Sequence, residues 1–208
     1  MIPYRGQWES ASRIGSFIAG GDAAADPLWA RSGAATAAEY ARWAEHLCGV
    51  ACLRMVLAAR GVEVSAFDAM RALRARGGYV EEADGAIRGL IYAPAVAWLA
   101  EVHGIAARII LDLDAAAVPA LLKEGLFIAS VHPAIRDPRS AAPGQGGHLV
   151  LVHGVTPDGA LVLHNPSGDR PETQADARVE IADFSRFFAG RGILVPHVEQ
   201  TAPLTAGA

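Results

Sequence analysis

The 208-residue sequence predicts an α+β fold in one domain, with helices first and an antiparallel sheet after them. Two patterns lead to this prediction. Apolar residues recur at helical spacing between residues 36 and 103, whereas the later part has short apolar runs that end at turn residues. We expect residues 1–198 to form the domain and residues 199–208 to be a disordered tail.

Residues 1–37 are expected to be irregular and to wrap around the body of the domain. They contain a Gly-Gly-Asp run at positions 20–22, which favours turns, and two tryptophans, Trp8 and Trp29. Polar tails rarely hold two such large apolar side chains, so the segment is predicted to pack on the core.

The helices are predicted from caps and apolar spacing. Thr36 fits an N-cap because Glu39 follows at the capping-box distance. Val50, Leu53 and Leu57 place one apolar stripe on the next helix. The further expected helices span residues 65–76, 94–103, 114–123 and 182–188.

The strands are predicted from runs of β-prone residues between turn signals. They span residues 105–111, 126–131, 147–155, 160–165, 177–181 and 192–195. The run Thr-Pro-Asp-Gly at positions 156–159 has proline at the second and glycine at the fourth place of a turn, so the strands on either side should form an antiparallel hairpin.

Composition and charge exclude several classes of protein. The net charge of -4 and the pI near 6.0 give no support for a nucleic-acid or anionic-membrane partner. No segment approaches the roughly 18 consecutive apolar residues of a membrane span, and the N-terminus lacks a signal-peptide layout, so a cytoplasmic location is expected. Two cysteines exclude a disulfide framework, and no metal or organic cofactor is expected.

Cys48 stands at the expected start of a helix. Free backbone N–H groups and the helix dipole favour thiolate there, and a thiol pKa of roughly 8.5 can fall to about 3.5–7.5. Gly49 would leave room for substrate beside the sulfur. The alternative is an inert, buried cysteine, which is our interpretation of Cys52. A zinc site formed with His46 lacks a fourth ligand.

His148 leads the strand before the turn, and Asn165 ends the strand after it. If Thr156 pairs with Gly159, His148 and Asn165 are diagonal neighbours on one face, close enough to hydrogen-bond. A one-residue bulge in the turn would reverse this parity. Of the other histidines, His153 and His164 fall on the opposite face, and His46, His132 and His197 have no clear partner.

The motif Cys-Gly-x-Ala-Cys-Leu at positions 48–53, Gly147-His148 before an apolar strand, and Asn165-Pro166 after the next strand occur in this order. Together they resemble the bacteriocin-processing (double-glycine-leader) peptidases, in particular their stand-alone relatives, within the papain-like cysteine peptidase superfamily. The resemblance covers residues 2–195. It implies a bacterial cysteine-type hydrolase with a papain-like fold, whose N-terminal helical part carries the nucleophile helix on a C-terminal antiparallel sheet.

The resemblance implies a catalytic triad of Cys48, His148 and Asn165. The third position is more often aspartate in these peptidases. Asparagine can orient the imidazole but cannot offset its charge.

The resemblance also implies an oxyanion glutamine upstream of the cysteine. Residues 42–47 contain none, whereas Gln7 matches the early glutamine of the stand-alone relatives. Gly49 and Gly147 are expected to border the substrate.

The expected reaction is acyl transfer from a peptide or amide through a Cys48 thioester, with water as acceptor in a peptidase or amidase. Two alternatives stay open. One is an acyltransferase or peptide-modifying enzyme of the ligase or cyclase type, which would use an amine acceptor. The other is a catalytically inactive binding module.

Overall fold

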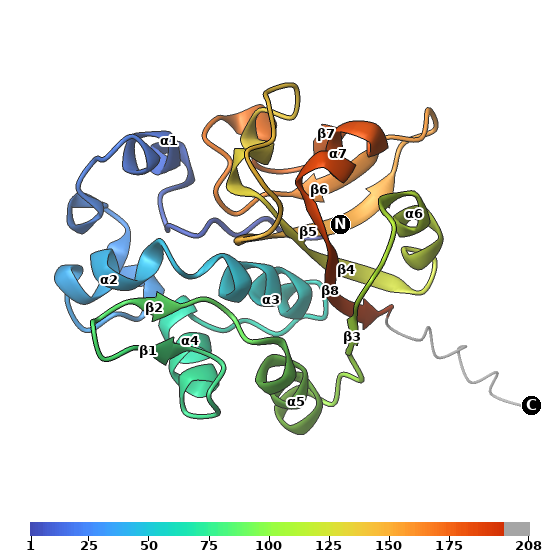
Figure 1. Cartoon of the computed structure of the whole chain (residues 1–208). Helices are drawn as coiled ribbons and strands as arrows, with labels where there is room; N and C mark the ends of the chain where they lie inside the picture. Colours follow the sequence, from blue (N-terminus) through green and yellow to red (C-terminus); the bar gives the residue numbers. More distant parts are fainter. Residues whose placement is uncertain (198–208) are drawn as a thin grey trace, which may run out of the picture.

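The computed structural model describes residues 1–197, and in it helices cover both faces of one antiparallel sheet (Figure 1). The predicted order, helices before an antiparallel sheet, is confirmed. The six strands follow the order β3-β8-β4-β5-β6-β7, and every neighbouring pair is antiparallel. They are β3 (Arg108–Ile110), β4 (Gly125–Val131), β5 (His148–Val155), β6 (Leu161–His164), β7 (Ala177–Val179) and β8 (Phe188–Pro196). The predicted tail lies outside the described residues.

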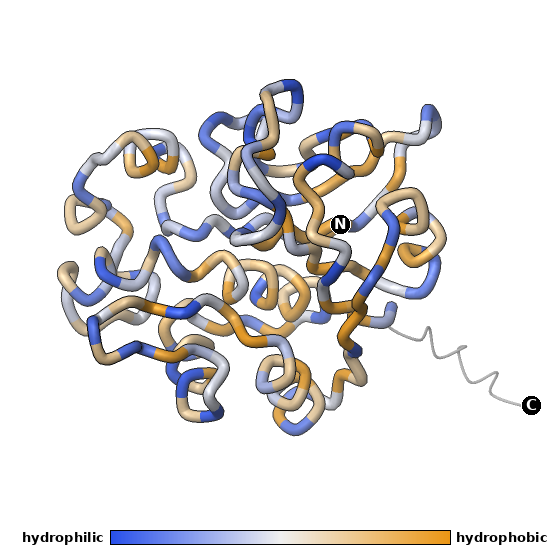
Figure 2. The backbone as a smooth tube through the Cα atoms, in the orientation of Figure 1, coloured by the Kyte–Doolittle hydropathy of each residue, from blue (hydrophilic) through white to orange (hydrophobic). Residues whose placement is uncertain are grey.

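Helix α3 (Cys48–Ala58) is the central helix of the larger helical layer and contacts β5 and β4. Most of its residues are buried, as expected for a helix that is apolar apart from one arginine, Arg54. Figure 2 shows this apolar character along α3 and along the central strands. Around it lie α2 (Ala37–Ala44), α4 (Ala66–Arg74) and α5 (Tyr92–His103).

The sheet divides the core into two clusters because side chains alternate along each strand. Leu149 and Leu151 of β5 belong to the cluster around α3. Val150 and Val152 belong to the cluster on the other face, which is covered by the short helices α6 (Val118–Leu121) and α7 (Ile181–Phe187). Both sides of β5 are therefore buried, which fixes the strand that begins with His148.

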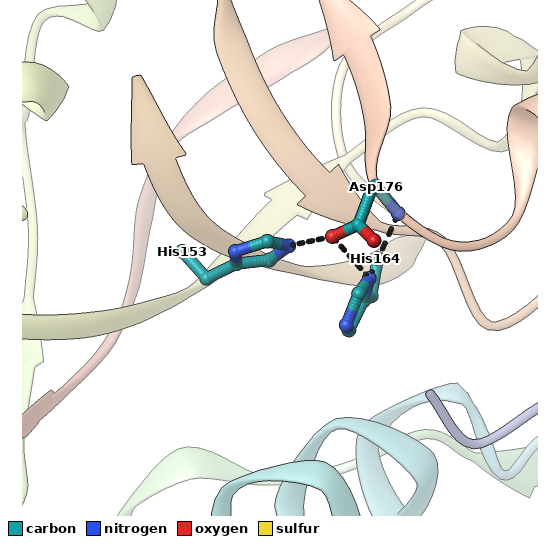
Figure 3. A group of neighbouring side chains, drawn as sticks. All are labelled: His153, His164 and Asp176. Atoms are coloured by element: carbon teal, nitrogen blue, oxygen red, sulfur yellow. Dashed lines mark hydrogen bonds and ion pairs between the residues drawn. The ribbon is translucent and has the colours of Figure 1, made fainter. Parts of the chain in front are cut away.

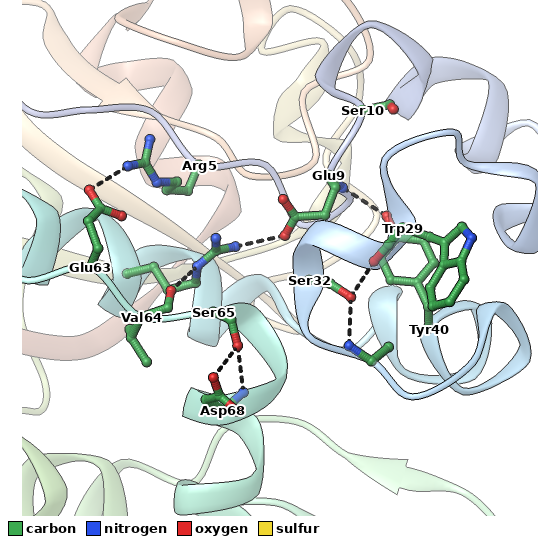
Figure 4. A network of polar contacts seen from close by, with 12 residues as sticks. Arg5, Glu9, Ser10, Trp29, Ser32, Tyr40, Glu63, Val64, Ser65 and Asp68 are labelled. Carbon is green, nitrogen blue, oxygen red and sulfur yellow. Dashed lines mark hydrogen bonds and ion pairs between the residues drawn. The ribbon is translucent and has the colours of Figure 1, made fainter.

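The N-terminal segment wraps around the helical layer and is anchored by polar contacts. Asp26 is buried and accepts hydrogen bonds from the Ser10 backbone N–H (3.1 Å) and the Tyr40 hydroxyl (2.6 Å). Burial alone would raise the pKa of Asp26, but these and further hydrogen bonds lower it. Figure 4 shows the same region, where Tyr40 also accepts from the Glu9 N–H (2.8 Å) and Arg5 pairs with Glu63 (2.7 Å).

The structure differs from the predicted elements in two places. The N-terminal segment is less irregular than predicted, and a small hairpin later in the chain was not predicted. The early residues form a helix, α1 (Ile14–Ile18), and three short 3-10 helices, η1 (Ala11–Arg13), η2 (Ala23–Ala25) and η3 (Trp29–Ser32). Strands β1 (Val80–Glu81) and β2 (Ile87–Arg88) pair with each other in a separate two-stranded sheet. Two-residue strands carry too little alternation to be seen in a sequence.

Helix boundaries agree with the predicted caps. Thr36 accepts a hydrogen bond from the Glu39 N–H (3.0 Å), and Ser65 accepts one from the Asp68 N–H (3.1 Å). The expected helix at 114–123 is instead the 3-10 helix η4 (Ala115–Ala117) followed by α6. Over residues 1–197, no helix has both the length and the apolar character needed to cross a membrane.

Candidate active site

The β5–β6 hairpin reaches the predicted alignment of His148 and Asn165 by a different register. Thr156 pairs with Ala160 and not with Gly159 across the strands, because its N–H donates to the Ala160 carbonyl (2.8 Å). The strands therefore begin one residue out of the predicted register. A bulge between Val152 and Gly154 then shifts the register back. Two shifts of one residue cancel, and the predicted parity holds at the far end of the hairpin.

His148 and Asn165 are joined by a hydrogen bond of 2.8 Å between Nε2 and Oδ1. The Ser167 backbone N–H also donates to Asn165 Oδ1 (3.1 Å), which identifies that atom as the amide oxygen. An oxygen acceptor requires Nε2 to carry the proton, so Nδ1 holds a lone pair. Nδ1 has no hydrogen-bond partner within the described part of the chain, and this leaves it free to accept a proton.

Ser167 and Arg136 form a second support for His148. The Ser167 hydroxyl lies 3.1 Å from His148 Nε2. The Arg136 guanidinium donates to the Ser167 carbonyl through Nε (2.6 Å) and to the Ser167 hydroxyl (2.8 Å). Arg136 thereby places a half-buried positive charge beside the histidine. With Thr156 paired to Gly159, the predicted register already places Ser167 opposite His148, whereas Arg136 was not singled out from the sequence.

His148 is neutral in this environment. Its side chain is buried, and burial is the main reason that its pKa is lowered from 6.5 to about 4. The hydrogen bond to Asn165 raises the pKa, whereas the positive charge of Arg136 and the electrostatic effect of His132 lower it. A neutral imidazole with a free Nδ1 is suited to act as a base at neutral pH.

Cys48 begins α3, as predicted, and is half-buried, whereas Cys52 one turn later is buried. The expected depression of the thiol pKa is wrong for this structure. Burial raises the pKa of the Cys48 thiol above its ordinary value and outweighs the donors that lower it. Those donors are the backbone N–H groups of Leu149, Gly49 and Cys48 itself, together with the charge of Arg136.

Cys48 and His148 line the same cavity, which has a volume of about 570 Å³. No hydrogen bond joins Cys48 Sγ to either ring nitrogen within residues 1–197. The pair is therefore not assembled as an ion pair in this structure, and the raised thiol pKa and lowered histidine pKa agree with that. Catalytic hydrogen bonds are often long before substrate binds.

The remaining walls of the cavity are largely apolar and carry one permanent charge. Ile109 and Leu111 are 38% and 64% exposed, which is unusual for large aliphatic side chains. Arg191 is the only lining residue from the described part of the chain with a permanent charge. Tyr92 also lines the cavity. Burial raises its pKa, and hydrogen bonding to Ser130 and the charge of Arg191 offset only part of that increase.

The two glycines expected beside the substrate differ in position. Gly147 lines the cavity and has φ of +93°, a conformation that side-chain-bearing residues rarely adopt. Gly49 is buried and is not among the residues that line the cavity. A Cβ at Gly49 would lie 2.6 Å from the Leu90 Cβ, so close packing accounts for this glycine.

Gln7 lies beside the segment that carries Asn165. Its backbone N–H donates to the Pro166 carbonyl (2.8 Å), and the Tyr4 hydroxyl donates to the Asn165 carbonyl (3.0 Å). The Gln7 side chain is buried, and its Oε1 has no hydrogen-bond partner within residues 1–197. Gln7 is not among the residues that line the cavity, so its role at an oxyanion hole stays a prediction.

The other histidines are divided between local roles and one cluster. His132 Nδ1 accepts from the Ala134 N–H (3.1 Å), and His197 contacts the Leu122 carbonyl (3.0 Å). His46 lies 3.3 Å from the neighbouring Glu45. His153 and His164 lie with ring centroids 4.3 Å apart and ring planes tilted by 54°.

Neither the family models nor the curated proteins contain a match to this chain. Among solved structures, the chain is similar to the peptidase domain of Streptococcus ComA, which is described as a bi-functional ABC transporter involved in a quorum-sensing pathway. The sequence identity is 19%, the match covers 74% of this chain and 93% of that chain, and the TM-score is 0.48. A likeness of this degree concerns the fold alone.

Proposed function

We propose that this chain is a cysteine-dependent acyl-transfer enzyme that cleaves peptide or amide bonds, with Cys48 as nucleophile and His148 as base. The observation that carries the proposal is the fixed tautomer of His148. Asn165 and Ser167 determine that Nε2 holds the proton, and the same histidine lines a cavity with Cys48. A structural histidine has no need of a free nitrogen in a cavity that it shares with a half-buried thiol at a helix start.

In the proposed mechanism, His148 Nδ1 takes the thiol proton as Cys48 Sγ attacks the substrate carbonyl carbon. The imidazolium then gives that proton to the leaving amine, and a thioester remains on Cys48. His148 next deprotonates water, which attacks the thioester carbonyl; the C–S bond breaks, the acid is released, and the imidazolium returns its proton to the Cys48 thiolate. Asn165 keeps the ring oriented throughout.

We assign the oxyanion to the Cys48 backbone N–H and the Gln7 side-chain amide. The Gln7 backbone N–H donates to the carbonyl of Pro166, the residue that follows Asn165. A rotation of the Gln7 side chain toward the cavity would let its NH₂ group donate to the oxyanion. Removing such a donor would cost about 10²–10³ in rate.

Because the thiol and the imidazole are both neutral, a depressed thiol pKa is not the property to test. The test is whether His148, acting as a base, speeds the alkylation of Cys48. Iodoacetamide should label Cys48 well before buried Cys52, with the sites separated by peptide mass spectrometry. His148→Ala should slow the labelling of Cys48 at pH 7, whereas His46→Ala should not.

If Cys48 resists labelling, or reacts equally in the parent and in His148→Ala, the chain is better described as a binding module with a cleft. If the labelling depends on His148, added amines distinguish the remaining possibilities. A product that carries the amine indicates an acyltransferase, and a free acid alone indicates a peptidase or amidase.

A further inference from the structure

A second polar cluster lies on the strands that carry His148 and Asn165. It consists of His153 on β5, His164 on β6 and Asp176 just before β7 (Figure 3). Asp176 Oδ1 is 3.2 Å from His153 Nε2 and 3.8 Å from His164 Nδ1. The three atoms lie within 4.8 Å of one another. The proposed acyl transfer uses none of these side chains.

His153 Nε2 is a buried nitrogen whose 3.2 Å contact with Asp176 Oδ1 lacks hydrogen-bond geometry, and it has no hydrogen-bond partner in the described part of the chain. The side chain is only 13% exposed, and His153 is the extra residue in the bulge between Val152 and Gly154. Buried polar atoms in folded proteins nearly always have a partner, so an orphaned nitrogen beside a carboxylate requires an explanation. A cation bound between them would supply the missing partner.

His164 has the tautomer that a metal ligand needs. Its Nδ1 accepts the Asp176 backbone N–H (3.0 Å), so Nδ1 holds a lone pair directed toward Asp176. Its Nε2 therefore carries the proton and donates to the Ile2 carbonyl (3.0 Å). Histidines that bind metals generally donate their second nitrogen to such a carbonyl, which fixes the orientation of the ring.

We propose that His153 Nε2, His164 Nδ1 and Asp176 Oδ1 bind a divalent transition-metal cation, with Zn²⁺ the best match. Zn–N and Zn–O bonds of about 2.0–2.2 Å in a tetrahedron place ligand atoms about 3.3–3.5 Å apart. The separation of 3.2 Å between His153 Nε2 and Asp176 Oδ1 agrees with that spacing. Two imidazoles and one carboxylate suit Zn²⁺ better than Mg²⁺ or Ca²⁺.

Two features define how the cation would enter. Asp176 is 66% exposed, so the site opens to solvent on that side, and water can fill the fourth position. The cation must also displace the Asp176 N–H from His164 Nδ1, and the freed N–H can turn to water at this exposed position. Because His164 precedes Asn165, the bound metal would also stabilise the end of β6 that presents Asn165.

The test uses the full chain in a Cys48→Ser background, because a thiol beside a histidine can bind zinc by itself. After treatment with a chelator, Zn²⁺ is added and followed by calorimetry, and Co²⁺ is added and followed by its visible absorption. We expect one equivalent to bind, a tetrahedral cobalt spectrum, and a higher thermal midpoint with Zn²⁺. His153→Gln and Asp176→Asn should each weaken binding at least tenfold.

His46→Gln is the matched control, since it removes a histidine outside the cluster, and it should leave the affinity unchanged. Asp176 has φ of +51°, which asparagine also tolerates, so Asp176→Asn should fold normally. Binding that survives both cluster variants would overturn the proposal. Failure of the Cys48→Ser protein to bind Zn²⁺ would also overturn it and would assign zinc binding in the parent to the thiol.

Discussion

The β5–β6 hairpin carries two histidine sites that differ in how the protein occupies the ring nitrogens. At His148, a side-chain amide holds Nε2, and Nδ1 is left for the cavity. At His164, backbone groups contact both nitrogens, and a carboxylate lies beside the ring. A neutral amide partner leaves a neutral base, whereas a carboxylate near two imidazoles favours a cation. The hydrogen-bonding partners of each histidine, and not the residue type, therefore separate the role of a base from the role of a metal ligand.

The largest expected difference is in catalysis. His148→Ala should lower the hydrolysis rate of an activated ester probe by about 10²–10⁴, the usual contribution of a general base. His153→Gln, on the same strand, should change the rate by no more than a few-fold. Steady-state kinetics of both variants check this. Equal losses would mean that the two sites act through the stability of the hairpin and not through separate chemistry.

Both sites should make the free energy of unfolding fall as the pH is lowered. His148 and His153 each have a pKa lowered to about 4, chiefly by burial. The unfolded chain takes up these protons near pH 6.5 and the folded chain only near 4, so stability is full above 6.5 and falls as the pH drops toward 4. Each histidine contributes on the order of 3 kcal/mol to the change in the free energy of unfolding.

Urea unfolding in chelator at pH 7, 5.5 and 4 measures this slope. His148→Gln and His153→Gln should each flatten it by a similar amount. A slope unchanged by His148→Gln would contradict the burial of a neutral imidazole at that position.

The alignment of His148 with Asn165 could be predicted from the sequence because side-chain parity survives an even number of shifts. The turn prediction was wrong by one residue, since Thr156 pairs with Ala160, and the bulge at His153 was not visible in the sequence. Strand parity is a local property, but a bulge depends on tertiary packing. His153 and His164 already share one face in the predicted register, but nothing in the sequence indicated that Asp176 comes to lie beside them.

The chemistry at Cys48 was predicted only in part. A helix start is visible from spacing, so the position of the cysteine could be predicted. Its pKa depends on how much water the fold removes, which no local pattern records. Arg136 was missed for a similar reason, because it comes near His148 only after a separate loop packs against the hairpin, whereas the predicted register already places Ser167 opposite His148.

A smaller effect should follow from Arg136, whose charge acts on the His148 site. Arg136→Gln should raise the pKa of the Cys48 thiol and of His148, because the cation now lowers both. The pH profile of Cys48 alkylation should therefore move to higher pH on both limbs. Arg139→Gln, an exposed arginine of the same loop, is the control. An unmoved profile would show that Arg136 only holds the Ser167 backbone.

The smallest expected effect concerns the charge that the Cys48 cavity prefers on its ligand. Arg191 lines the cavity with Cys48 and forms no ion pair within the described residues, so the cavity should favour an anionic group on its ligand. Iodoacetate carries such a group, and iodoacetamide does not. Arg191→Gln should lower the ratio of their rates at Cys48 by a few-fold at low salt, while Arg178→Gln on β7 should leave it unchanged. A ratio that does not respond would mean that Arg191 remains in solvent, and the apolar wall of Ile109 and Leu111 would then be the main determinant of what the cavity binds.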